Sequence, residues 1–187
     1  MLAGGIHGSL TVYTVSGSVT LDRSTGPVDV TTVSGSINSA SPSGELKAKT
    51  VSGDMTVQDA VLRSARLNTV SGRCILDLRH GPSLVTANSV SGAVSVRLPA
   101  DCGYDATLAS TSGNVVVDGE TLVSEGKRGG HRYTGDRSVA IKARAVGGDL
   151  AVLRRAAAGG TTPPGPVIGD AFGGDIQDEI RRPEENR

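Results

Sequence analysis

The chain has 187 residues with 19 basic and 19 acidic side chains, and only four residues are aromatic, none of them Trp. This balance of charge leaves no strongly basic footprint for nucleic acid, and no apolar run approaches the length of a membrane span. A hydrophobic core in such a chain has to be built from Val, Leu, Ile and Ala.

A motif of four residues, Thr-Val-Ser-Gly or a close variant, recurs along the first part of the chain. Its glycines are 18, 18, 19, 20 and 21 residues apart, at Gly17, Gly35, Gly53, Gly72, Gly92 and Gly113. A regular period of this length is typical of chains in which each repeat forms one unit stacked on its neighbours.

Glycines also recur at half this period, and alternating apolar residues such as Leu10 and Val12, or Val28 and Val30, follow them. Alternation with a period of two indicates strands with one buried face, so each repeat is predicted to contain two short strands. We therefore expect an all-β fold over residues 1–155. It would be a β-solenoid, or β-helix-like stack, of about seven coils of about 18 residues, with two parallel sheets around a narrow aliphatic core.

The register loosens after Gly53. Leu62 replaces a half-period glycine, one extra residue precedes Gly72, and two extra residues precede Gly92. Additions of this size are expected to bulge outward at the corners and to leave the strands intact. Residues 118–137 are charged and glycine-rich and predict an inserted loop. The segment 145–148, Ala-Val-Gly-Gly, then replaces the motif and predicts a seventh and final coil.

Residues 156–187 differ in composition from the repeats. A Gly/Pro/Ala-rich stretch is followed by a charged end, which predicts a disordered tail. The alternative is a docking peptide that folds on a partner or on the solenoid end, with Phe172, Ile176 and Ile180 on one face of a short helix.

The recurrent stretches TVSGSVTL, TVSGDMTV and AVGGDLAVL resemble a bacterial family of adhesin-like domains of unknown function. The resemblance covers about residues 4–155. It implies a bacterial β-solenoid, in some members attached to the cell surface or linked to envelope-stress systems, and it carries no catalytic residues over to this chain.

The motif side chains on either side of the valine are expected to face outward, because the valine (Val15, Val33, Val51, Val70, Val90) shares its parity with buried positions. Stacking would align them in two exposed hydroxyl columns. Either these hydroxyls satisfy backbone groups at the bend, or they form a regular surface for a repetitive ligand such as a glycan or an ordered water lattice. The candidate ladder consists of Thr14, Ser16, Thr32, Ser34, Thr50, Ser52, Thr69, Ser71, Ser89, Ser91, Ser110 and Ser112.

No catalytic or metal-binding pattern is evident, so we expect neither an enzyme nor a cofactor. The three histidines, His7, His80 and His131, are too scattered for a metal cluster. Arg73 after a motif glycine argues against a calcium-binding nonapeptide repeat. An active site in the 118–137 loop would use Glu120, Glu125, His131 and Tyr133, and a solvated insertion is the alternative.

The two cysteines are not expected to form a disulfide. Cys74 falls in the same column as Val19, Ile37, Met55 and Val94, which predicts a buried core residue, whereas Cys102 lies in a corner insertion. The absence of a predicted disulfide fits a reducing compartment.

The function predicted from these features is a non-enzymatic adhesin-like binding or structural module for a protein or glycan surface, in association with the cell envelope. The alternative is a cytosolic scaffold or assembly protein that recruits partners through the solenoid end and the tail, with end-to-end self-association. The sequence as it stands shows no secretion signal and predicts a cytoplasmic location. A missing N-terminal segment would instead make the cell surface the expected location.

Overall fold

In a computed structural model, residues 1–79, 83–124 and 127–155 are described, and within them every regular element is a β-strand. By contacts the chain divides into a unit of Met1–Ala157 and a second unit of Ala158–Arg187. The predicted disordered tail, residues 156–187, lies outside the described residues. The prediction of an all-β chain is confirmed for the part described, and this part contains no helix long and apolar enough to cross a membrane.

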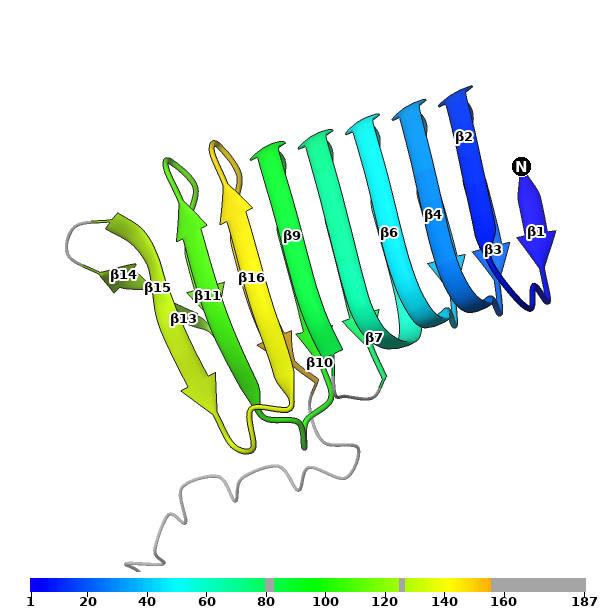
Figure 1. Ribbon diagram of the computed structural model, residues 1–187. Helices are drawn as coiled ribbons and strands as arrows, with labels where there is room; N and C mark the ends of the chain where they lie inside the picture. Colours follow the sequence, from blue (N-terminus) through cyan, green and yellow to red (C-terminus); the bar gives the residue numbers. More distant parts are fainter. Residues whose placement is uncertain (80–82, 125–126, 156–187) are drawn as a thin grey trace, which may run out of the picture. The chain divides into compact units, whose positions relative to one another are not determined.

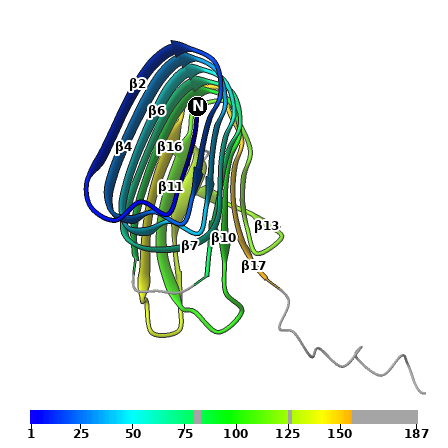
Figure 2. The same cartoon turned by 90° about the vertical axis from the view of Figure 1, so that its right-hand side faces the viewer.

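The strands form one continuous hydrogen-bonded sheet that folds into two layers (Figures 1 and 2). The long-strand layer contains, in spatial order, β2 (Leu10–Ser16), β4 (Thr25–Ser34), β6 (Ser43–Ser52), the second half of β7 (Met55–Ser71), β9 (Ser83–Ser91), β16 (Val139–Ala145), β11 (Tyr104–Ser110), β15 (Lys127–Thr134) and β14 (Val123–Ser124).

The short-strand layer faces it from the other side in Figure 2. This layer contains β1 (Leu2–Gly4), β3 (Val19–Asp22), β5 (Ile37–Ala40), the first half of β7, β8 (Cys74–Leu78), β10 (Val94–Leu98), β17 (Leu150–Arg154), β12 (Val115–Val117) and β13 (Glu120–Thr121).

From β2 to β9 in the long-strand layer and from β1 to β10 in the short-strand layer, neighbouring strands are parallel and pair 18 to 20 residues apart. Val28 lies opposite Leu10 and also opposite Leu46, each 18 positions away. Between β6 and β7 the register shifts after Gly44, which pairs with Leu62, so that Glu45 pairs with Ser64. The extra residue of this repeat, Arg63, is therefore absorbed by a β-bulge, as expected for a one-residue insertion.

The last repeat is not at the end of the stack. β16 pairs with β9 on one side and with β11 on the other, and β17 likewise lies between β10 and β12. In Figure 1 the yellow β16 accordingly separates the two green strands β9 and β11. The expected final coil is therefore the last repeat in the sequence but does not end the row of strands, because its strands lie between those of the fifth and sixth repeats.

Residues 118–137 are not a loop throughout. β15 pairs antiparallel with the outer edge of β11, and β13 pairs antiparallel with β12. These strands close the end of the stack that would otherwise expose the edges of β11 and β12, which is a common way to protect a sheet from edge-to-edge association.

The core between the layers is aliphatic, as the composition predicts. Leu21, Ile37, Met55 and Leu76 are at most 1% exposed. Cys74 pairs with Met55 and Val94 and is 1% exposed, which confirms its predicted place in the core. Burial raises the pKa of the Cys74 thiol to about 12, so it behaves as a small apolar side chain.

Candidate functional site

On the outer face of the long-strand layer, the motif residues face differently from what the sequence predicts. The motif valines, predicted to be buried, are exposed, and the side chain before each valine is buried instead, except for the half-buried Thr14 on the edge strand. Thr32 is 1% exposed and Val33 is 47% exposed. The reason is local: two successive residues, Val33 and Ser34, both lie outward where the strand ends at the corner.

The exposed valines form a ridge that crosses the strands, which we call the valine ridge. Their exposed fractions lie between 46% and 54% within the stack and reach 73% for the one on the edge strand β2. The valine ridge consists of Val15, Val33, Val51, Val70, Val90 and Val146. Because adjacent strands are about 4.8 Å apart, the ridge repeats at that spacing.

A shallow groove of about 310 Å³ runs along this ridge across β4, β6, β7 and β9. Its other wall is formed by Thr31, Lys49, Asn68 and Asn88, and the inward-facing Thr32, Thr50, Thr69 and Ser89 also line it. We call it the ridge groove. Nearly all of its accessible surface is apolar, and we call the wall of Thr31, Lys49, Asn68 and Asn88 the polar wall after its residue types.

The polar wall includes an amide ladder and continues into a group of cations. The Asn88 side-chain amide donates to the Asn68 oxygen at 2.9 Å. Five outward-facing basic residues, called the basic face, lie on β6, β7 and β16: Lys47, Lys49, Arg66, Lys142 and Arg144.

Ion pairing neutralises little of the basic face. Lys47 contacts Asp29 with 2.7 Å between Nζ and Oδ2, whereas the other four make no ion pair within the described part of the chain. No carboxylate occupies the same columns between β6 and β16, since those positions are held by Asn68, Thr86 and Asn88.

The predicted hydroxyl ladder is thus split by the structure. Its serines Ser16, Ser34, Ser52, Ser71, Ser91 and Ser112 are exposed, as expected. The outward direction is wrong for Thr32, Thr50, Thr69, Ser89 and Ser110, which are buried, while Thr14 on the edge strand is half-buried.

Three members of this inward column make hydrogen bonds at the corner. The Thr69 hydroxyl donates to the Ser71 carbonyl oxygen at 3.3 Å, and the Ser89 hydroxyl donates to that of Gly92 at 3.1 Å. The Ser110 hydroxyl donates to the Gly148 carbonyl oxygen and accepts from the amide of Gly113, both at 2.9 Å. At Thr69, Ser89 and Ser110 the hydroxyl satisfies backbone groups of the turn, which valine cannot do. The buried hydroxyls of Thr32 and Thr50 have no hydrogen-bond partner among the described residues.

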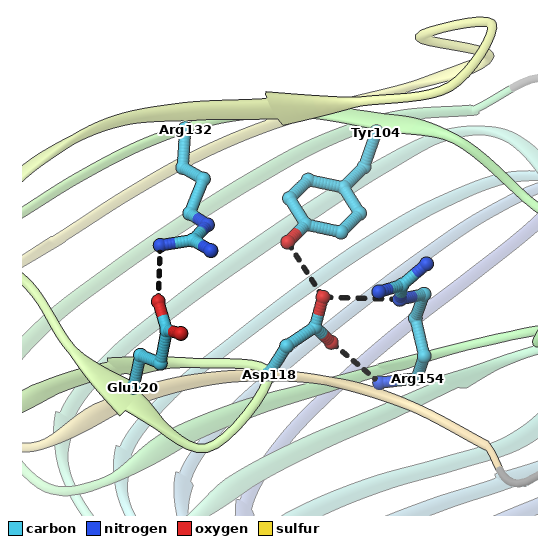
Figure 3. A network of polar contacts seen from close by, with 5 residues as sticks. All are labelled: Tyr104, Asp118, Glu120, Arg132 and Arg154. Carbon is cyan, nitrogen blue, oxygen red and sulfur yellow. Dashed lines mark hydrogen bonds and ion pairs between the residues drawn. The ribbon is translucent and has the colours of Figure 1, made fainter.

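A second polar network lies between the layers at the closed end (Figure 3). The Tyr104 hydroxyl donates to Asp118 at 2.8 Å, and Asp118 also accepts from the backbone amide and the side chain of Arg154, at 3.2 and 3.0 Å. Arg132 donates to Glu120 at 2.6 Å. The contacts of Asp118, which follows β12, connect β11 and β17 and so fasten the inserted last repeat to the sixth, while Arg132 and Glu120 connect β15 to β13.

Tyr104 provides a test of this network. It is 1% exposed, and burial, together with its hydrogen bond to Asp118, raises its pKa from 10.0 to about 12. Between pH 10 and 12 the unfolded chain loses this proton while the folded chain keeps it, so the free energy of unfolding should fall as the pH rises. We expect Tyr104→Phe to remove this part of the slope in urea unfolding measured from pH 9 to 12.

The exposed Tyr133 supplies the control for that experiment, because Tyr133→Phe should leave the alkaline slope unchanged. At pH 7 Tyr104→Phe should cost about 2 kcal/mol, the usual value for losing a hydrogen bond to a charged group. Equal alkaline slopes in wild type and Tyr104→Phe would show that Tyr104 is not the titrating group.

Of the residues predicted for a site in 118–137, His131 and Tyr133 lie side by side with ring centres 5.8 Å apart, and Glu120 does not join them. His131 contacts Asp105 at 2.6 Å on the outer face, and Arg137 lies 4.0 Å from the ring centre of Tyr133. Glu120 instead contacts Arg132, which alternates with His131 and Tyr133 along β15. Glu125 and His80 lie outside the described residues.

No three His, Cys, Asp or Glu side chains of the described ranges lie close enough together to hold a metal ion. Both cysteines are free. Comparison of the chain with protein-family models, with curated proteins and with solved structures finds no match.

Proposed function

We propose that this chain is a non-enzymatic binding module, an adhesin-like β-solenoid of about seven coils whose ridge groove holds an extended ligand. The solenoid arrangement is supported by parallel pairing of residues one period apart in both layers, as for Leu10 with Val28 and Leu2 with Thr20. In this arrangement each coil contributes one strand to each layer, and the corners align the motif residues of successive coils.

The observation that carries the proposal is the ridge groove itself. Four successive repeats contribute equivalent residues to it, so its contacts repeat along its length. Contiguous exposed apolar surface of this kind is characteristic of interaction sites. A ligand with its own repeat is suited to such a surface, because each unit meets the same pair of walls.

The test is binding of the purified chain to an array of immobilised polysaccharides and extended peptides. The variant Val51→Gln/Val70→Gln removes the apolar wall without changing the charge, and Asn38→Gln/Thr56→Gln on the outer face of the short-strand layer is the matched control. Loss of a bound ligand in the first variant alone supports the proposal. Absence of any ligand, or equal loss in both variants, would overturn it.

A second candidate function, an assembly protein that joins copies end to end, is favoured by the other end of the stack. β1 and β2 each pair on one side only among the described strands, and Leu2, Tyr13 and Val15 there are 80%, 74% and 73% exposed. Sedimentation over a concentration series, with Leu2→Asp/Tyr13→Asp as the comparison, decides it: oligomers that this variant abolishes support assembly, and a monomer throughout excludes it.

A further inference from the structure

The outer face of the long-strand layer carries basic side chains in a regular arrangement beside the apolar groove. Lys49 belongs to the polar wall of the ridge groove, and Asn68, Asn88 and Arg144 follow it in register on the next three strands. The adjacent column holds Lys47, Arg66, Thr86 and Lys142 in the same order. Cations therefore stand at both ends of this row of four strands, about 14 Å apart, with hydrogen-bonding side chains between them.

Some basic residues near the ends of the short strands are neutralised by carboxylates. Arg154 contacts Asp118 at 3.0 Å, and Arg155 contacts Asp77 at 2.6 Å and Asp59 at 3.4 Å, whereas Arg79 and Arg97 have no ion pair among the described residues. On the basic face only Lys47 has such a partner. The four remaining cations there are exposed on one face of the layer, so an anionic ligand meets them without first displacing a carboxylate of the chain.

We infer that the basic face and the ridge groove together bind a linear acidic glycan, a polysaccharide that carries carboxylate or sulfate groups and lies across the strands. This inference rests on the proposed function and names the class of its ligand. Lys49, Arg66, Lys142 and Arg144 contact the anionic groups, Asn68 and Asn88 bond to hydroxyls, and the valine ridge packs against the C–H faces of the sugar rings.

Two other polyanions fit the surface less well. Single-stranded nucleic acid is held largely by stacking of its bases on aromatic side chains, and neither wall of the ridge groove contains an aromatic residue. A peptide that adds a strand to a sheet gains its affinity from backbone hydrogen bonds at an edge, whereas β6, β7, β9 and β16 are paired with strands on both sides. An acidic peptide would therefore have only the side chains of this face to bind. The hydroxyls and anionic groups of a glycan can be bound by side chains alone, and this face presents side chains of the kinds that bind them.

The experiment is affinity electrophoresis of the full chain through gels that contain polygalacturonate, dextran sulfate or neutral dextran, at two salt concentrations. Lys49→Glu/Arg144→Glu reverses two cations of the basic face. Arg79→Glu/Arg97→Glu makes the same change in net charge at exposed positions of the short-strand layer, where neither residue has an ion pair among the described residues. Oligothymidylate and polyglutamate, added to the gel, test the two other polyanions.

We expect both acidic glycans to retard the chain, neutral dextran to leave it unaffected, and salt to weaken the binding. Lys49→Glu/Arg144→Glu should raise the dissociation constant at least tenfold, and Arg79→Glu/Arg97→Glu should change it less than threefold. Equal loss in the two variants, preference for oligothymidylate or polyglutamate, or no retardation by either glycan would overturn the inference. If the array still shows a ligand that Val51→Gln/Val70→Gln abolishes, the proposed function stands without this ligand class. If no ligand binds in either assay, both fail.

Discussion

Gly53→Ala should destabilise the chain by more than about 4 kcal/mol, at the upper end of what a single substitution does. Gly53 has a φ of +141°, and a Cβ atom there would overlap the carbonyl oxygen of Gly35, its counterpart in the preceding repeat. The oxygen belongs to the backbone, and the backbone also fixes the position of the Cβ atom, so no rotamer change can relieve the overlap. The measurement is urea or thermal unfolding of the two proteins.

Another motif glycine in the same column, Gly17, provides the control for Gly53→Ala. Gly17 also has a positive φ, +100°, but a Cβ atom there would meet nothing within 4 Å. Gly17→Ala therefore carries only the conformational penalty of a left-handed residue, about 1–2 kcal/mol. If the two alanine variants were equally stable, the close approach of successive corners would not be the reason for the glycines.

Ile141→Asp should open the stack in its middle. Ile141 is fully buried in β16, and an unpaired carboxylate in an aliphatic core costs about 5 kcal/mol or more. Because β16 pairs with both β9 and β11, amide hydrogen exchange should accelerate in these two strands together. Amides of β2 and β4, several strands away, should keep more of their protection, since repeat stacks can open locally.

The neighbouring Lys142→Asp is the comparison for this prediction. Lys142 is exposed on the same strand, so its replacement should cost about 1 kcal/mol or less. The prediction fails if Ile141→Asp accelerates exchange in β11 and leaves β9 protected, because the last repeat would then not lie between them.

The repeat period and the apolar alternation predicted the strands, the aliphatic core and the place of Cys74. They failed at Thr32 and Val33, because hydropathy alone favours burying valine. The corner has two outward positions in a row, and in the later repeats the inward hydroxyls of Ser89 and Ser110 bond to its backbone. A period of two counted through the corner therefore assigns the wrong side to both residues.

The order of the repeats was beyond what periodicity can predict. Residues 139–145 have the same alternation as β9 and β11 and fit in register with either. Their place depends on the antiparallel β15, which occupies the far edge of β11. The valine ridge and the basic face, which depend on the facing of the motif and on strand order, could be assembled only from the structure.

The insertion of β16 and β17 also has a consequence for biosynthesis. Ser83 pairs with Val139, so one edge of β9 stays unpaired until residues 139–145 have been synthesised and have left the ribosome. β11 of the sixth repeat is synthesised earlier. It either stays unpaired until then, or pairs with β9 and is later displaced by β16. Long-range parallel pairing of this kind is slow, and an open edge strand is prone to aggregate. Nascent chains stalled before residue 139 should therefore need chaperones more than the finished protein does.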